Sequence, residues 1–214
     1  MRNTTSKQEK IRHNELELAE KKLAEVLYRF QSYFPSFIPL VRATIFHFGG
    51  ETATTHKTFN YENFQNAVFH ISIPLDYILN FEPTQPLATK INLYTTLLHE
   101  YLHILFYHFD FPGNEDDIER FKYACEYAID RFIKEAVKSE IFTPQPFYEL
   151  FIKKFEELLP AYKNTPAEKL NPWEIYKKIN NEILNNIKKI APFNQCLFWH
   201  NKDAIKKAGN TKSS

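Results

Sequence analysis

The chain has 214 residues, of which 27 are basic and 26 are acidic, so its formal net charge is +1. This balance is unlike the strongly basic surface of a dedicated nucleic-acid or membrane-surface binder, and neither kind of partner is expected. No linker rich in Gly, Ser or Pro divides the sequence. These features predict a single domain over residues 1–200 and a polar, disordered tail over residues 201–214.

The N-terminal segment and the cysteines indicate a compartment. The first residues are polar and lack the apolar core of a signal peptide, and the longest apolar stretch, around Leu97 to Phe106, is interrupted by His and Glu. Cys125 and Cys196 form no CxxC pair, which argues against a disulfide framework and against a thiolate zinc site. We therefore expect a cytoplasmic protein in a reducing compartment.

An amphipathic helix is predicted first, from Ser6 to about Tyr33. Its apolar residues recur at steps of three and four, as Leu16, Ala19, Leu23, Val26, Leu27 and Phe30. This spacing places them in one stripe that can face a core.

Strands are predicted next. Leu40 to Phe48 and Asn66 to Ile73 alternate with the two-residue period of strands, Gly49-Gly50 marks a turn, and Pro74 ends the second segment. This pattern predicts a small antiparallel sheet, and the alternation admits a third strand near Thr54 to Phe59.

The rest of the chain has the pattern of helices. They are expected over Leu87 to Phe109, Asp116 to Lys138, Pro146 to Leu159 and Pro172 to Ile190. The last begins with Asn171 as N-cap and Pro172 at the first helical position. The expected fold class is therefore α+β, with a small sheet and a mostly helical remainder.

The segment with the clearest chemistry is the HExxH pattern formed by His99, Glu100 and His103, in a helix that is apolar nearly all round and so is predicted to be buried. Four residues advance an α-helix by about 400°, so the two histidines lie on one face, about 6 Å apart along the axis, and can bind one metal ion. Glu100 lies beside them, where its carboxylate can take a proton from a zinc-bound water and later give it to the leaving amine. Burying three such side chains without a metal would be costly.

A catalytic zinc has three protein ligands and one exchangeable water, so a third ligand is needed. His108 is five residues beyond His103, or about 500° around a regular helix, which points it about 140° away from the pair. No glycine lies between the two to break the helix. His108 is therefore expected to be structural or part of the cleft wall, and it stays as an alternative ligand. A group that stabilises the oxyanion is also expected, and His108, Tyr107 and Tyr148 are the alternatives for it.

Glu126 is the preferred third ligand. A tight loop from Phe109 to Glu115 separates the motif helix from the next one, so the two are expected to form an antiparallel hairpin. Glu126 lies about ten residues, or 15 Å, into the second helix, and His99 lies about ten residues before the end of the first. The heights of the two side chains therefore agree.

Asp130 lies one turn beyond Glu126 on the same face. A carboxylate there can accept the second ring N–H of a ligating histidine and so fix its tautomer. The alternative is that Glu126 and Asp130 are solvated surface acids that pair with Lys122 and Lys134.

This combination resembles known metallopeptidase patterns. HExxH followed by a helix of form ExxxD, here Glu126 to Asp130, is similar to the gluzincin arrangement of thermolysin-like peptidases. More of the chain, roughly Val68 to Ile179, resembles the metallopeptidase domain found beside von Willebrand factor A-like domains. The matching segments are His70 to Tyr77, His99 to His108, Phe121 to Asp130 and, more loosely, Pro172 to Tyr176.

The resemblance implies a minimal zincin-like fold, a zinc cofactor, a protein or peptide substrate and a separate von Willebrand factor A-like partner, and it keeps His108 as a rival or additional ligand. The chain departs from the family pattern where Glu126 replaces Asp, Asp130 replaces Asn, Phe121 replaces Trp and Tyr107 replaces Gly. By analogy with zincins, the strand Val68 to Ile73 would be an edge to which an extended substrate adds.

The expected function is hydrolysis of a peptide bond by zinc on His99, His103 and Glu126, with Glu100 as general base and then acid. The rival is a metal-stabilised binding or regulatory module without turnover, which would follow if His108 completed a closed set of four ligands. A helical scaffold without metal is the third alternative, and it would leave the motif residues in need of other buried partners.

Overall fold

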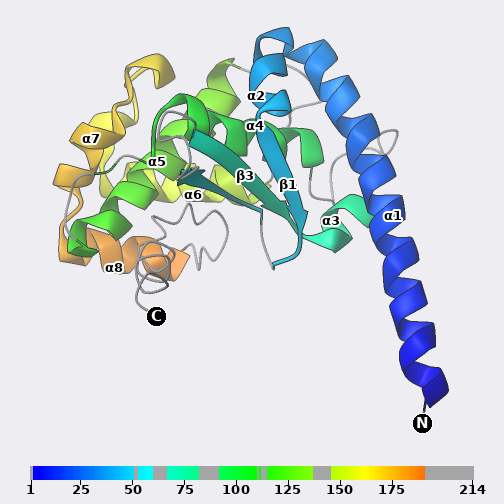
Figure 1. Cartoon of the computed structure of the whole chain (residues 1–214). Coiled ribbons are helices and arrows are strands. Elements are labelled where there is room, and N and C mark those ends of the chain that lie inside the picture. The colour runs from blue at the N-terminus through cyan, green and yellow to red at the C-terminus, as the bar shows by residue number, and fades with distance from the viewer. Residues whose placement is uncertain are drawn as a thin grey trace, which may run out of the picture.

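The structure, a computed structural model, describes residues 2–50, 53–59, 67–81, 92–109, 111, 115–136 and 146–190. Within these residues the fold is mixed α+β, with helices around a small three-stranded sheet (Figure 1). The expected fold class is confirmed. The predicted tail over residues 201–214 lies outside the described residues.

The N-terminal helix α1, Arg2–Tyr33, packs through one stripe. Ala19, Leu23, Val26 and Phe30 are buried in that stripe, as their spacing predicts. The chain then passes through a 3-10 helix η1, Pro35–Phe37, into a short helix α2, Ile38–Arg42. The predicted strand over Leu40 to Phe48 is therefore wrong in its first part, because Pro39 lies in the first turn of α2 and favours a helix start.

The sheet contains β1 (Thr44–Phe48), β2 (Thr54–Phe59) and β3 (Ala67–Ile73). β3 lies in the middle, parallel to β1 and antiparallel to β2. The antiparallel prediction is wrong for the β1–β3 pair. After the turn at Gly49 and Gly50, where Gly50 has a φ of 85°, the chain reverses into β2 but leaves one strand position between them, which β3 then fills.

This order also corrects the expected substrate edge. Val68 to Ile73 is central, because its backbone groups pair with β1 on one side and with β2 on the other. Within the described sheet the edges are β1 and β2. Pro74 ends β3 as predicted, and a short helix α3, Leu75–Leu79, follows it.

The sheet has one buried face and one partly exposed face. Ile71 and Ile73 of β3 are fully buried, and so is Thr55 of β2. Side chains alternate between the faces of a strand, so His56 and His70 lie on the opposite face. This alternation separates the core-facing residues from a row of polar ones.

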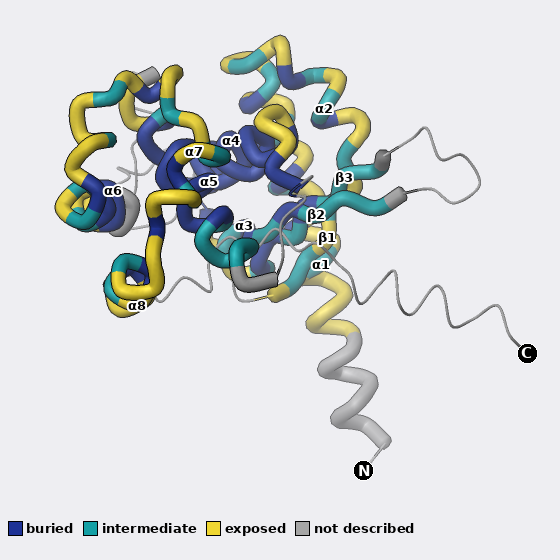
Figure 2. The backbone as a smooth tube through the Cα atoms, turned by 90° about the vertical axis from the view of Figure 1, so that its left-hand side faces the viewer, coloured by how far each residue is buried: buried dark blue, intermediate teal, exposed yellow. Residues whose placement is uncertain are grey.

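Two helices lie at the centre of the molecule, α4 (Leu93–Leu105) and α5 (Glu115–Ala136). Figure 2 shows both as largely buried, and residues 93–104 of α4 and 123–131 of α5 are buried without exception. The motif helix is shorter than predicted, because it ends at Leu105 rather than Phe109; residues 87–91 lie outside the described part of the chain.

The C-terminal part contains α6 (Pro146–Leu158), α7 (Pro172–Ile175) and α8 (Asn181–Ile190), joined by 3-10 turns at Pro160–Tyr162, Ala167–Lys169 and Tyr176–Lys178. The single helix predicted over Pro172 to Ile190 is wrong. Asn180 interrupts it, since its side chain accepts a hydrogen bond from the Ile183 amide at 2.8 Å and starts α8. α7 and α8 lie on the opposite side of the molecule from α1 (Figure 1).

Helix α5 contributes to two apolar clusters. Cys125 and Ile129 pack in a cluster with α1, the sheet and α4, whereas Ala124 and Tyr127 pack in a second cluster with α6, α7 and α8. Contacts on both sides fix the position of α5 relative to α4. Among the described residues, no helix combines the length and the apolar character needed to cross a bilayer.

Candidate metal centre

Helix α4 places the motif residues inside the core. Its N-cap is Asn92, whose side chain accepts hydrogen bonds from the amides of Tyr94 at 3.0 Å and Thr95 at 3.3 Å. The helix is apolar nearly all round, and the prediction that it is buried is confirmed. His99, Glu100 and His103 are all buried as well, at 2 % exposure or less.

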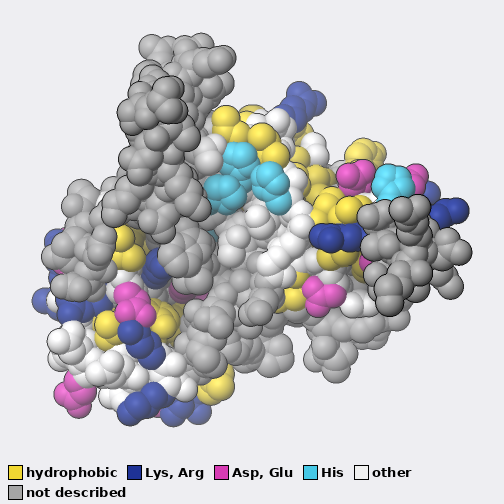
Figure 3. Space-filling view, turned by 60° about the horizontal axis from the view of Figure 1, so that its bottom comes forward, with side chains coloured by type: hydrophobic (Ala, Val, Ile, Leu, Met, Phe, Trp, Pro, Cys, Tyr) yellow, Lys and Arg dark blue, Asp and Glu magenta, His cyan; other side chains and the backbone are white. Residues whose placement is uncertain are grey.

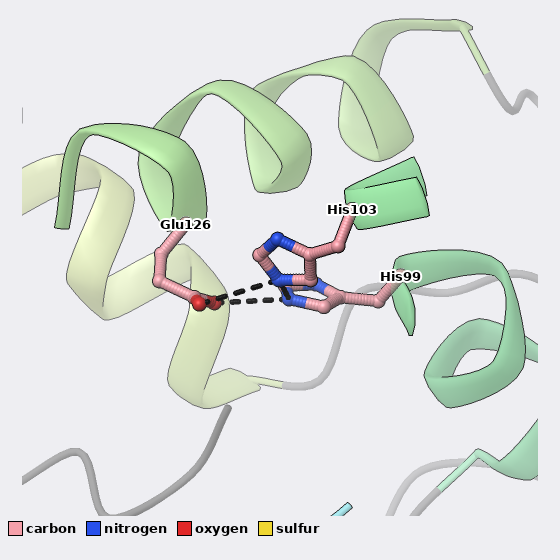
Figure 4. Close-up of side chains that lie close together, drawn as sticks. All are labelled: His99, His103 and Glu126. Atoms are coloured by element: carbon pink, nitrogen blue, oxygen red, sulfur yellow. Dashed lines mark hydrogen bonds and ion pairs between the residues drawn. The ribbon is translucent and has the colours of Figure 1, made fainter. Parts of the chain in front are cut away.

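The structure brings His99, His103 and Glu126 together, as Figure 4 shows. His99 Nε2 lies 2.9 Å from Glu126 Oε2 and 3.2 Å from His103 Nε2, and His103 Nε2 lies 3.3 Å from Glu126 Oε1. Two imidazoles and a carboxylate, from two packed helices, therefore point their donor atoms at one small volume. This buried group could hold a metal ion.

The spacing fits a tetrahedral ion. Donor atoms about 2.0–2.1 Å from one ion at tetrahedral angles lie about 3.3 Å from one another, which matches the separations of 3.2 and 3.3 Å, while the His99–Glu126 separation of 2.9 Å is shorter. Glu126 Oε1 is also buried and accepts no hydrogen bond within the described part of the chain. A buried carboxylate oxygen without a hydrogen-bond donor is costly, and a cation would offset that cost.

Each histidine has a partner on its outer nitrogen. His99 Nδ1 lies 3.2 Å from Asp130 Oδ1, and His103 Nδ1 lies 3.0 Å from His108 Nδ1. When Nε2 of each ring is the ligand, Nδ1 carries the proton and faces this neighbour, which favours the ligating tautomer; for His99 the contact with Asp130 is an ion pair. The position predicted for Asp130 agrees with this arrangement.

His108 reaches His103 because the motif helix ends earlier than a regular helix would. Tyr107 has a φ of 55° in the left-handed region, and the His108 amide donates to the His103 carbonyl oxygen at 3.2 Å, a common helix-ending turn. The assumption that this turn needs a glycine is wrong. His108 is buried, but it contacts the outer nitrogen of His103 rather than the group of three donors.

Glu100 faces the sheet, where the hydroxyl of Thr55 on β2 donates a hydrogen bond to Glu100 Oε2. Thr55 is fully buried. Sequence reasoning missed this partner. The alternating pattern of β2 indicates which residues share a face, but nothing in it shows that this face meets α4.

The electrostatics follow from burial and from the paired charges. Burial alone would lower the pKa of His99, but the carboxylates of Glu126 and Asp130 raise it well above its usual value. Burial opposes ionisation of Glu126, yet the neighbouring histidines lower its pKa to about 2. Burial raises the pKa of Asp130 to about 6. Burial and, next, the proximity of His103 lower the pKa of His108.

Several alternatives from the sequence can now be compared with the geometry. Glu126 and Asp130 are not solvated acids, since they are 4 % and 3 % exposed. Cys125 is buried and free, and burial raises the pKa of its thiol, so it is a poor ligand. Tyr107 is exposed, and the side chain of Tyr148 lies outside what the structure describes.

An apolar pocket of about 500 Å³ lies beside the centre, and His108 forms part of its wall. Phe106, Phe132 and Trp173 supply most of its aromatic surface. His108 therefore stands between this pocket and the ring of His103.

Comparisons of the chain with protein families, with curated proteins and with solved structures found no match. The resemblance to zincin metallopeptidases therefore stays a prediction.

Proposed function

We propose that this protein is a zinc-dependent hydrolase that cleaves peptide bonds. The observation that carries the proposal is the convergence of His99, His103 and Glu126 on one volume, with Glu100 beside them on the same helix. Nitrogen and carboxylate donors in this number match the ligand set of catalytic zinc sites, which keep one position for water or substrate. Asp130 and His108 would hold the two imidazoles in the ligating tautomer.

When bound, zinc would supply Lewis-acid polarisation of the scissile carbonyl and of the attacking water. Glu100 would take the proton from the attacking water as the water oxygen bonds to the carbonyl carbon. The same carboxyl group then gives the proton to the amine as the C–N bond breaks. The hydroxyl of Thr55 donates a hydrogen bond to Glu100 Oε2 and so orients this carboxylate.

The sheet offers a place for an extended substrate. β2 forms an edge of the described sheet, and Thr55 connects this strand to Glu100. A peptide that adds to this edge as a further strand would lie close to the general base. β2 replaces the central strand β3 in this role.

One observation favours a second candidate, a binding or regulatory module in which the metal only ties α4 to α5. The three donor residues are 4 % exposed or less, and a peptide needs more access than that to reach them. The absence of a fourth protein donor from the described group supports the hydrolase instead.

Glu100→Gln separates the two candidates. The amide keeps the shape of the side chain but cannot accept the proton, so the variant should retain zinc and fold while losing cleavage of an unfolded substrate such as casein. Glu17→Gln, at an exposed position of α1, is the matched control and should cleave like the wild type. All proteins are compared at equal zinc content.

Equal cleavage by wild type and Glu100→Gln would remove Glu100 from the mechanism and indicate a contaminating protease. Zinc-loaded wild type that cleaves no substrate would favour the binding module.

A further inference from the structure

Three histidines from three different strands meet on the exposed face of the sheet. We call His47 of β1, His56 of β2 and His70 of β3 the sheet histidine cluster. The ring centroid of His70 lies 5.1 Å from that of His47 and 4.7 Å from that of His56. All three rings are within 22° of parallel to one another. Figure 3 shows histidine side chains gathered on this surface.

Hydrogen bonds orient the central ring. His70 Nε2 lies 2.8 Å from the hydroxyl of Thr58, and His70 Nδ1 lies 2.9 Å from His47 Nε2. When His70 carries its proton on Nε2 and donates it to Thr58, its Nδ1 lone pair faces His47. A metal-ligating histidine is commonly held in this way, with its second N–H donated to an oxygen.

The 2.9 Å separation also suits a metal ion. Two nitrogens about 2.0–2.1 Å from one ion at a right angle lie about 2.9 Å apart, which is the cis spacing of tetragonal Cu²⁺ or Ni²⁺ sites. The same separation occurs at the buried centre between His99 Nε2 and Glu126 Oε2, so the preference for Cu²⁺ comes from the all-imidazole donor set of the cluster.

We propose that the sheet histidine cluster is a second metal site, distinct from the buried centre, which binds Cu²⁺ through His47 Nε2, His70 Nδ1 and a nitrogen of His56. The ion replaces the proton shared by His47 and His70, and that proton is released to solvent. The ring of His56 is parallel to that of His70 within 4°, so its nitrogens lie beside the pair rather than pointing at it. Rotation about its side-chain bonds brings one nitrogen to the ion.

The pKa values of two cluster histidines favour metal binding at neutral pH. Burial, followed by the neighbouring histidines, lowers the pKa of His56, and burial followed by His47 lowers the pKa of His70. Neutral imidazole is the form that ligates, and Cu²⁺ binds nitrogen donors most strongly among the divalent first-row ions.

The test is a Cu²⁺ titration of the zinc-loaded full-length protein against glycine as competing chelator, followed by electron paramagnetic resonance. Zinc is measured in the same samples. Wild type should bind one equivalent more Cu²⁺ than His70→Ala or His47→Ala. His56→Ala should still bind this Cu²⁺, but its electron paramagnetic resonance spectrum should show hyperfine coupling to fewer nitrogens. Thr58→Val should bind the Cu²⁺ about tenfold more weakly.

Two matched controls lie outside the cluster's hydrogen bonds. His13→Ala removes an exposed histidine of α1, and Thr54→Val removes a hydroxyl from the same strand and face as Thr58. Both should bind Cu²⁺ like the wild type. Circular dichroism checks that each variant folds, and His47→Ala, on an edge strand, gives a second reading if His70→Ala does not fold.

Equal Cu²⁺ stoichiometry and affinity in wild type, His70→Ala and His47→Ala would overturn the proposal. Unchanged nitrogen coupling in His56→Ala would overturn the three-histidine assignment. If both wild type and His70→Ala lost zinc in proportion to the Cu²⁺ they bound, the copper would lie in the buried centre. That result would also overturn the proposal.

Discussion

The molecule groups histidines in two places that differ in burial and in charged neighbours. At the buried centre, His99 and His103 lie beside the carboxylates of Glu126 and Asp130. On the sheet, His47, His56 and His70 contact one another and Thr58. The pKa of His99 is raised well above its usual value, whereas those of His56 and His70 are lowered. Burial lowers all of these pKa values, so the carboxylates decide the sign.

The largest expected effect is the loss of zinc when a ligand of the buried centre is removed. Wild type as purified should contain about one equivalent of zinc, and His99→Ala or His103→Ala should contain almost none after dialysis. His70→Ala is the matched control and should keep the full amount, because its histidine lies on the exposed face of the sheet. Plasma emission spectrometry measures the metal. Full zinc in both His99→Ala and His103→Ala would contradict the site.

The same substitutions should affect stability differently. His99→Ala leaves the buried Glu126 without one of its partners, which should lower the free energy of unfolding of the metal-free protein by about 3–5 kcal/mol. Urea denaturation measures this change. A loss no larger than that of His13→Ala would show that Glu126 does not depend on His99.

A second effect separates the inner donors from their outer partners. His108→Ala should lower the affinity for zinc by about 10–100-fold, because among the metal-centre atoms His108 contacts the outer nitrogen of His103 and not the group of three donors. Glu126→Ala should lower the affinity for zinc by a larger factor, since it removes one of the three donor groups. Competition with a chromogenic chelator gives both affinities. Loss of zinc from His108→Ala but not from Glu126→Ala would make His108 the third ligand.

The core of this site could be predicted from the sequence because its parts are local. HExxH spacing places His99 and His103 on one face, and equal heights on two neighbouring helices pointed to Glu126. Thr55 and the sheet histidine cluster could not be predicted, since both depend on the strand order. The turn at Gly49 and Gly50 indicated a reversal but not the open strand position that β3 fills. Asn180 is an N-cap residue that starts a new helix, but it lies inside a segment with helical periodicity, so the sequence predicted one continuous helix there.

A smaller effect concerns pH. In the unfolded chain His70 has its ordinary pKa of 6.5, whereas in the fold its pKa is lower, so the unfolded state binds more protons between these values. The stability linked to neutral His70 in the fold is therefore fully present above about pH 6.5, and it is lost as the pH falls from there through the pKa of His70 in the folded protein. His70→Gln should therefore lose less stability than wild type between pH 7 and 5, measured by urea denaturation. An equal loss, as expected for the control His13→Gln, would contradict the lowered pKa.

The smallest effect is at Tyr107. Glycine adopts a positive φ without the steric cost that tyrosine incurs, but it also gains more freedom in the unfolded chain, so Tyr107→Gly should change the free energy of unfolding by less than about 1 kcal/mol. Phe106→Gly, at an ordinary negative φ of −89°, should be more destabilising. Thermal denaturation compares the two. A larger loss in Tyr107→Gly than in Phe106→Gly would show that the tyrosine side chain matters more than its backbone angle.

The position of α5 between two apolar clusters has a kinetic consequence. Separation of α5 from α4 would carry Glu126 away from His99 and His103, and the packing of Ala124 and Tyr127 on the other side of α5 resists that movement. Escape of an ion from the buried centre is then controlled by an opening of the protein rather than by attack of the chelator. Its rate constant should not depend on the chelator concentration once the chelator is in excess, and it should rise steeply with temperature. An ion on the exposed face of the sheet has no such barrier, so the two sites would exchange metal on different timescales.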